Sequence, residues 1–130
     1  MGNLLQSVPY FGDEVLSFGL PEPWYTDLYR GAKTVHLIYG AYREYVDKTG
    51  GPVKICQSPS RDHGKYMMLK LKTVRSFSTL AECFDSEEFG WVNIAPQAAN
   101  SEEAYNICEA SMGLTEGKPN IIALVLESYY

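Results

Sequence analysis

The sequence has few cysteines, no long apolar run, and almost no positive charge in its second half. Three cysteines, Cys56, Cys83 and Cys108, are too few and too widely spaced to outline a disulfide framework. No apolar stretch approaches the ~20 residues that span a bilayer, and no basic segment precedes an apolar one at the N-terminus. We therefore expect an intracellular protein, cytoplasmic or nuclear, that does not enter a membrane.

Patterns that would hold a metal or a cofactor are also missing. The chain has two histidines, and neither a Cys-x-x-Cys nor a His-x-x-x-His spacing occurs. Glycine-rich phosphate loops of the Walker or dinucleotide-binding kind are absent. The sequence predicts no metal site and no bound cofactor.

Positive and negative charges are segregated along the chain. Residues 30–75 carry ten of the eleven lysines and arginines against three acidic side chains, whereas beyond residue 75 Lys118 stands against nine acids. The net charge of −5 therefore conceals a basic middle region suited to phosphate and an acidic second half. The alternative for any single lysine is an ordinary solvated strand face.

Alternating apolar residues predict most of the strands in the first two thirds of the chain. A first strand is expected near residues 15–20, and a helix then begins at Pro23 and ends at Gly31. Three further strands are predicted at 34–39, 53–56 and 67–72, the last of them central. Trp24 and Leu28, four residues apart, are expected to pack inward.

Capping patterns predict two more helices in the acidic half. Thr79 with Glu82 and Asn100 with Glu103 each place a carboxylate three residues after a capping side chain. Strands are expected at 91–95 and at 121–126, the second one buried on both faces. This order predicts an α+β fold, a mixed β-barrel decorated by about three helices. Residues 15–130 are expected to form one domain, preceded by a loose extension at 1–14.

Several of these segments, in this order, resemble the ASCH family. The helix at 23–28 reads Pro-Trp-Tyr-Thr-Asp-Leu and precedes Gly-x-Lys-Thr-Val at 31–35, and the strand at 51–58 reads Gly-Pro-Val-Lys-Ile-Cys-x-Ser. The segment from Arg75 to Glu88 also looks like the family's later strand and capped helix. Two positions depart from the family pattern, because His36 stands for a usual Glu and Ile38 for a common Arg.

The resemblance implies a PUA-like barrel with a cleft that binds RNA, another single-stranded nucleic acid or a modified nucleoside. Such a cleft needs cations for phosphate, a stacking surface for a base and edge-reading hydrogen bonds. We expect a monomer or weak dimer whose cleft contacts come from eight residues, namely Lys33, Arg43, Lys54, Ser58, Arg61, Tyr66, Lys70 and Lys72.

Two other functions are compatible with the resemblance. Some family members are small amidohydrolases that deacetylate 4-acetylcytidine. Their catalytic positions correspond here to Lys33, His36 and Glu88, with Glu87 as the neighbouring possibility for the glutamate. In the family, the second of these positions carries a hydroxyl, and here it is occupied by His36. That histidine would act as a general base on water, or else it is a structural strand histidine whose hydrogen bonds are made within the protein. The third possibility is a coactivator-like protein-interaction domain that docks through the acidic half.

Overall fold

The computed structural model describes residues 15–58, 65–86, 88–113 and 120–129. Within them, five strands form one sheet in the order β1-β3-β4-β5-β2. The strands are β1 (Leu16–Leu20), β2 (Val35–Tyr39), β3 (Pro52–Gln57), β4 (Tyr66–Phe77) and β5 (Ile121–Ser128). The helices are α2 (Trp24–Arg30), α3 (Tyr42–Val46), α4 (Leu80–Asp85), α5 (Trp91–Ile94) and α6 (Ser101–Met112).

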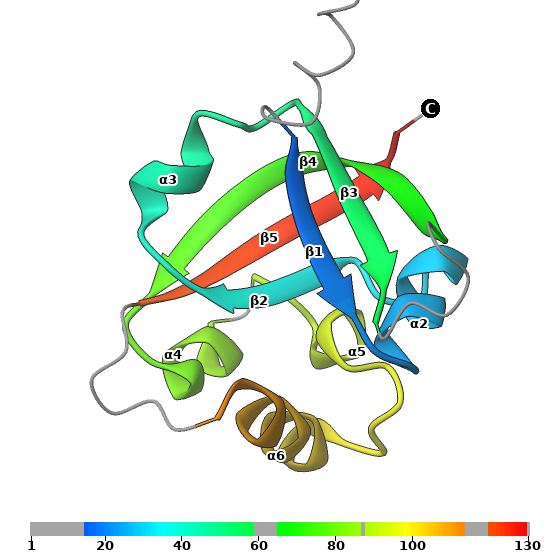
Figure 1. Cartoon of the computed structure of the whole chain (residues 1–130). Coiled ribbons are helices and arrows are strands. Elements are labelled where there is room, and N and C mark those ends of the chain that lie inside the picture. The colour runs from blue at the N-terminus through cyan, green and yellow to red at the C-terminus, as the bar shows by residue number, and fades with distance from the viewer. Residues whose placement is uncertain (1–14, 59–64, 87, 114–119, 130) are drawn as a thin grey trace, which may run out of the picture.

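The sheet is mixed and curls into a half-barrel. β1 runs parallel to β3, and the other neighbours are antiparallel. β4, with twelve residues, lies in the middle of the sheet, which confirms the predicted central strand. The curl brings the two edge strands, β1 and β2, across one another (Figure 1). The predicted α+β, barrel-like fold is therefore confirmed.

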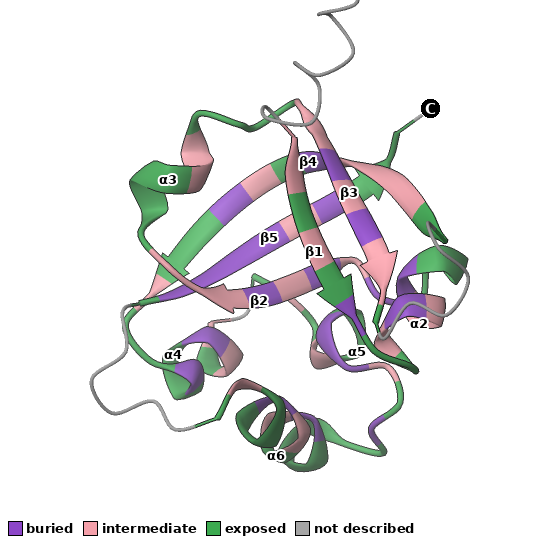
Figure 2. Ribbon diagram, viewed as in Figure 1, coloured by how far each residue is buried: buried purple, intermediate pink, exposed green. Residues whose placement is uncertain are grey.

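β5 separates two apolar cores. Its residues alternate, so that Ile121 and Ala123 face α4, α5 and α6 while Ile122, Leu124 and Leu126 face the inside of the curl. Most of the strand is therefore buried on both faces, as the continuous apolar run predicted (Figure 2). The two sides of this one strand hold the helical layer and the half-barrel together.

The capped helices lie where the sequence placed them. The Thr79 hydroxyl accepts a hydrogen bond from Glu82 N (3.0 Å) at the start of α4, and the Asn100 side chain accepts one from Glu103 N (2.9 Å) at the start of α6. Gly31 ends α2 with φ of +81°, a left-handed conformation that glycine adopts without steric cost. No helix in the described part of the chain has both the length and the apolar character needed to cross a bilayer.

Two short helices correct the predicted element order. Residues 91–95 were expected to form a strand, but Trp91–Ile94 is helix α5, closed by a hydrogen bond from Ala95 N to Trp91 O (2.9 Å). Residues 92 and 93 are both exposed, and residues 94 and 95 are both buried. This burial pattern fits a helix, because a strand would alternate exposed and buried residues. Helix α3, with no buried residue, lacks the apolar stripe from which a helix is predicted.

Candidate functional site

A pocket of about 480 Å³ opens where the two edge strands meet helix α6. Its volume lies in the range of small-molecule sites. Edge strand β1, the loop after it and α2 supply one side, β2 with Lys33 supplies the middle, and α5 and the end of α6 close the other side. The pocket is lined by Phe18, Gly19, Leu20, Pro21, Trp24, Lys33, His36, Leu37, Ile38, Tyr39, Ile94, Cys108, Ser111 and Met112.

The open edges of β1 and β2 direct backbone polar groups toward this pocket. Leu126 N donates to Thr34 O (2.8 Å) and Gly40 N donates to Asn120 O (3.0 Å), so the even-numbered residues of β2 pair with β5. The N–H and C=O groups of the odd-numbered residues, including Leu37, therefore point away from β5. On β1, Leu20 O accepts from Ser58 N (2.8 Å), which leaves the backbone groups of Gly19 facing the open edge.

Lys33 is a buried cation at the floor of the pocket. Its side chain is 3% exposed, and Nζ donates to Val35 O (2.5 Å) and to Ile94 O (2.6 Å). The ammonium also lies 4.7 Å from the ring centroid of Trp24, a favourable cation–π distance. Burial lowers the pKa of Lys33 to about 8, partly offset by Cys108 and Asp27, so the side chain is mostly protonated at neutral pH.

His36 is held as a neutral imidazole beside Lys33. It keeps some accessible surface at the pocket, and its ring meets the edge of Phe18 with centroids 5.3 Å apart. Burial, and then the positive charge of Lys33, lower the pKa of His36 to about 3. A neutral imidazole offers one donor and one acceptor, which suits recognition of a ligand edge. With so low a pKa it is a weak general base.

The cysteine of the pocket is also uncharged. Burial raises the pKa of Cys108 to about 11, against the opposing effect of Lys33, so the thiol stays protonated at neutral pH. Cys83 in the same core has a pKa raised to about 12, chiefly by burial. Neither has the lowered pKa that marks a reactive cysteine. No three His, Cys, Asp or Glu side chains gather as metal ligands within the described ranges.

The residues expected to be catalytic do not all meet at this pocket. Lys33 and His36 line it together, whereas Glu88 lies at the surface and forms an ion pair with Arg75. Glu88 is not among the described residues that line the pocket, and Glu87, the alternative for its position, lies outside the described residues. The pocket therefore brings together the ammonium of Lys33 and the imidazole of His36, without the carboxylate of Glu88.

The residues expected to contact nucleic acid are spread over several surfaces. Apart from Lys33, none of those described lines the pocket. Lys54 and Tyr66 line a second hollow on the sheet, and Lys70 and Lys72 lie on the same strand as Tyr66. Arg43 is exposed on α3, Ser58 is exposed just after β3, and Arg61 lies outside the described residues.

Sequence reasoning missed several side chains that complete the pocket. Cys108 and Met112 on α6 and Phe18 on β1 line the pocket, and apolar residues of this kind are expected in a core whether or not a binding site is present. Ser111 lies three residues after Cys108 on the same face of α6. A polar side chain beside apolar ones on that face is the sequence signal that could have pointed to a pocket. The contribution of β1 could not be read from periodicity, because it depends on how far the sheet curls.

Comparison with known proteins supports the fold and leaves the family open. No family model matches the chain, and no curated protein matches it. Among solved structures, the crystal structure of hypothetical protein PH0355 is similar with a TM-score of 0.65 and 20% identity, covering 87% of this chain and 97% of that one. The solution structure of PF0455 from Pyrococcus furiosus is similar with a TM-score of 0.58 and 17% identity, covering 88% and 97%. At these identities the likeness extends to the fold alone.

Proposed function

We propose that this protein binds a single nucleobase, as a nucleoside or as one unit of an RNA strand, in the pocket between β1, β2 and α6. The observation that carries the proposal is the combination of flat aromatic side chains with neutral, directional polar groups in a space of about 480 Å³. Aromatic side chains stack on bases, and strand edges with an imidazole present donors and acceptors to a base edge. The resemblance to the ASCH family supports the same ligand class.

The charges of the pocket favour a base over a phosphate. Lys33 Nζ is already hydrogen bonded to two carbonyl oxygens and lies against Trp24, so a third donor at most remains for a ligand. One such donor suits a carbonyl oxygen on a heteroaromatic ring or an acyl substituent. A phosphate group would instead require several charge-assisted contacts.

Binding is better supported than hydrolysis of an acetylated cytidine. An amidohydrolase needs a base strong enough to activate water, whereas His36, with a pKa of about 3, is weak, and Glu88 is paired with Arg75 outside the pocket. We therefore propose recognition without turnover. The Glu88→Gln substitution separates the two functions, because it should abolish a reaction that uses Glu88 and leave binding in this pocket unchanged.

Titration with cytidine, N4-acetylcytidine, uridine, adenosine and guanosine tests the proposal. Binding can be followed by isothermal titration calorimetry, which does not depend on Trp24, the tryptophan that lines the pocket and is replaced in one variant. Trp24→Leu should weaken binding of the preferred nucleoside by about tenfold, in keeping with the ~1–3 kcal/mol typical of one base–aromatic stack. His36→Leu should also weaken it, whereas Tyr29→Phe on the exposed side of α2 serves as the matched control.

Two results would contradict the proposal. One is a wild-type protein that binds none of the five nucleosides at millimolar concentration. The other is a preferred nucleoside whose affinity is unchanged in Trp24→Leu and His36→Leu. If the wild type releases cytidine from N4-acetylcytidine and Glu88→Gln does not, the protein is a hydrolase and the proposal of recognition without turnover is wrong.

A further inference from the structure

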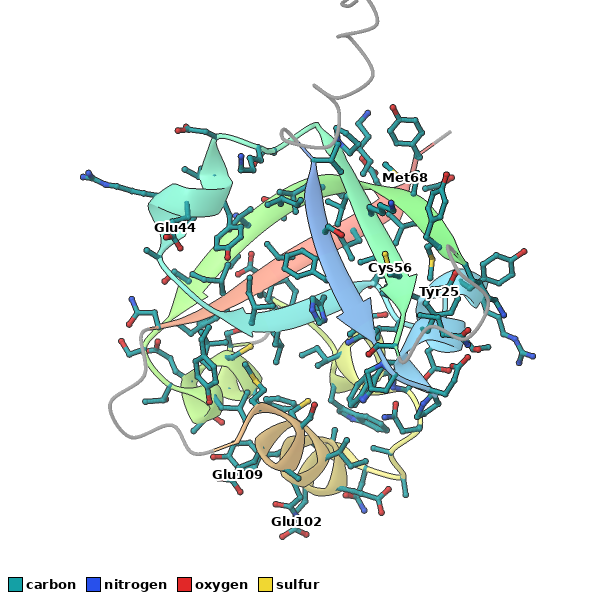
Figure 3. The ribbon with its side chains drawn as sticks, viewed as in Figure 1. Tyr25, Glu44, Cys56, Met68, Glu102 and Glu109 are labelled. Carbon is teal, nitrogen blue, oxygen red and sulfur yellow. The ribbon has the colours of Figure 1, made fainter. Side chains whose placement is uncertain are left out.

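A second hollow of about 400 Å³ lies on the outer face of β1, β3 and β4. Ser17, Lys54 and Met68 are register partners across these three strands and form its centre. The residues that alternate with them, Leu16, Val53 and Leu69, belong to the core inside the half-barrel. Figure 3 labels Met68 on β4 and, further along the neighbouring strand β3, Cys56, the register partner of Tyr66. The hollow is therefore a feature of the solvent-facing side of the sheet.

A lysine and a tyrosine are paired in this hollow. Lys54 Nζ lies 4.6 Å from the ring centroid of Tyr66, and the tyrosine is 51% exposed. Met68 provides an apolar floor next to them. A positive charge beside an exposed aromatic ring is the arrangement with which proteins hold single-stranded nucleic acid, since the cation meets phosphate while the ring stacks on a base.

Among the described residues, the charge around the hollow is mainly positive. Lys70 follows Met68 on the same face of β4 and pairs in register with Pro52, which also lines the hollow. Glu127 of β5 is the register partner of Lys70 on its other side and opposes part of this charge. The acidic side chains of α6 lie elsewhere, since Glu102 and Glu109 project from the helix away from the sheet (Figure 3). A polyanion is favoured here over an acidic protein surface.

β1 connects the second hollow to the pocket. Ser17 lines the hollow and Gly19, two residues further along the same face of β1, lines the pocket. Two strand residues span about 7 Å, so the two recesses begin close together on one continuous surface. A strand with one base in the pocket can therefore place an adjacent nucleotide on Lys54 and Tyr66.

We infer that the hollow on β1, β3 and β4 holds the nucleotide next to the one in the pocket, so that the ligand is a single-stranded nucleic acid and not a free nucleoside. This inference rests on the proposed function and deepens it by naming the substrate class. The pocket recognises one base, and the hollow adds a phosphate contact through Lys54 and a stacking contact through Tyr66.

Fluorescence anisotropy with a labelled cytidine octaribonucleotide tests the inference beside the nucleoside titration. Lys54→Gln and Tyr66→Ala should each weaken octamer binding by about fivefold to tenfold, at the lower end of the ~1–3 kcal/mol range for a stacked base. Both should bind the free nucleoside within twofold of wild type. Lys48→Gln, an exposed lysine outside the hollow, and Tyr29→Ala, an exposed tyrosine on α2, are the matched controls. Thermal unfolding of each variant establishes that it is folded.

Salt and ligand length separate the two proposals. Octamer affinity should fall between 50 and 200 mM salt, and it should fall less in Lys54→Gln because one phosphate contact is lost. Octamer binding that neither variant changes, or that is no tighter than nucleoside binding, would overturn the inference and leave the pocket proposal intact. Absence of nucleoside binding, with octamer binding that still depends on Lys54 and Tyr66, would overturn the pocket proposal and leave the hollow as a nucleic-acid contact that does not adjoin an occupied pocket.

Discussion

The buried ammonium of Lys33 is held by three contacts from separate parts of the chain. Val35 O is two residues away, Ile94 O comes from helix α5, and the ring of Trp24 comes from α2. Removing an ammonium group from water is costly, and hydrogen bonds to carbonyl oxygens offset much of that cost. The lysine therefore joins α2, β2 and α5 at the floor of the pocket.

The lowered pKa of Lys33 predicts a stability that rises with pH. Between its folded pKa of about 8 and the ordinary value of 10.5, the unfolded chain binds more protons than the folded one, so the free energy of unfolding increases. From pH 7.5 to 9 this contributes about 1 kcal/mol. Urea denaturation of the wild type and Lys33→Met at both pH values measures it.

The comparison with Lys33→Met is needed because two thiols act in the opposite direction. The unfolded thiols lose their protons near pH 9, whereas the raised pKa values of Cys83 and Cys108 keep them protonated in the folded protein, so they lower the free energy of unfolding as the pH approaches 9. The difference between wild type and variant measures the lysine together with its effect on the pKa of Cys108. An equal pH dependence in the two proteins would show that the ammonium is solvated in the folded state.

The lowered pKa of His36 predicts that the free energy of unfolding falls on acidification. Its folded pKa of about 3 lies below the ordinary 6.5, so the unfolded chain takes up the proton first as the pH falls from 7 to 5. We expect the wild type to lose about 1 kcal/mol more than His36→Gln over this interval, after allowing for partial solvation of the ring at the pocket. Denaturation curves at pH 7 and pH 5 measure the difference, and parallel losses would mean that the imidazole titrates normally.

Helix α6 depends on its N-terminal cap. The Asn100 side chain accepts from Glu103 N (2.9 Å), and Glu103 in turn accepts from Ala99 N (2.6 Å). Asn100→Ala should therefore lower the free energy of unfolding by about 1 kcal/mol, as is typical for loss of a cap. Ser101→Ala, at the next and exposed position, is the matched control.

The cap also bears on the pocket, because Cys108, Ser111 and Met112 lie at the far end of the same helix. A fully folded Asn100→Ala protein should bind its ligand with unchanged affinity, since the cap is about two to three helical turns from these residues. Unfolding of Asn100→Ala at the wild-type urea midpoint would contradict the role of the cap.

Capped helices and alternating strands could be predicted from sequence because their signals are local. Thr79 and Asn100 carry the cap pattern within four residues, and β5 shows its burial as a continuous apolar run. Helix α5 could not be predicted in this way. Its four residues contain β-branched and aromatic side chains that favour a strand, and its conformation is stabilised by the contact of Asn93 O with Thr34 N (2.9 Å) at the start of β2.

The two faces of strand β5 belong to different cores, so we expect the helical layer and the half-barrel to unfold together. Ile121 packs against the helical layer and Ile122 inside the half-barrel, and both are almost fully buried. Ile121→Ala and Ile122→Ala should each destabilise the whole protein by about 2–5 kcal/mol, the usual range for such truncations. Tryptophan fluorescence and far-ultraviolet circular dichroism should report the same urea midpoint for each variant. Separate midpoints would show that the layers unfold independently.

The positions of the five strands along the chain, the capped helices and the segregation of charge follow from the sequence, because each depends on residues close together in the chain. The grouping of functional side chains does not. Ten basic residues between 30 and 75 suggested one basic cleft, but alternation and the curl of the sheet place Lys33 in the pocket, Lys54 on the outer face and Arg43 on α3. Neighbouring strand residues point to opposite faces, so which side chains share a recess depends on how the two edge strands approach each other in the folded sheet.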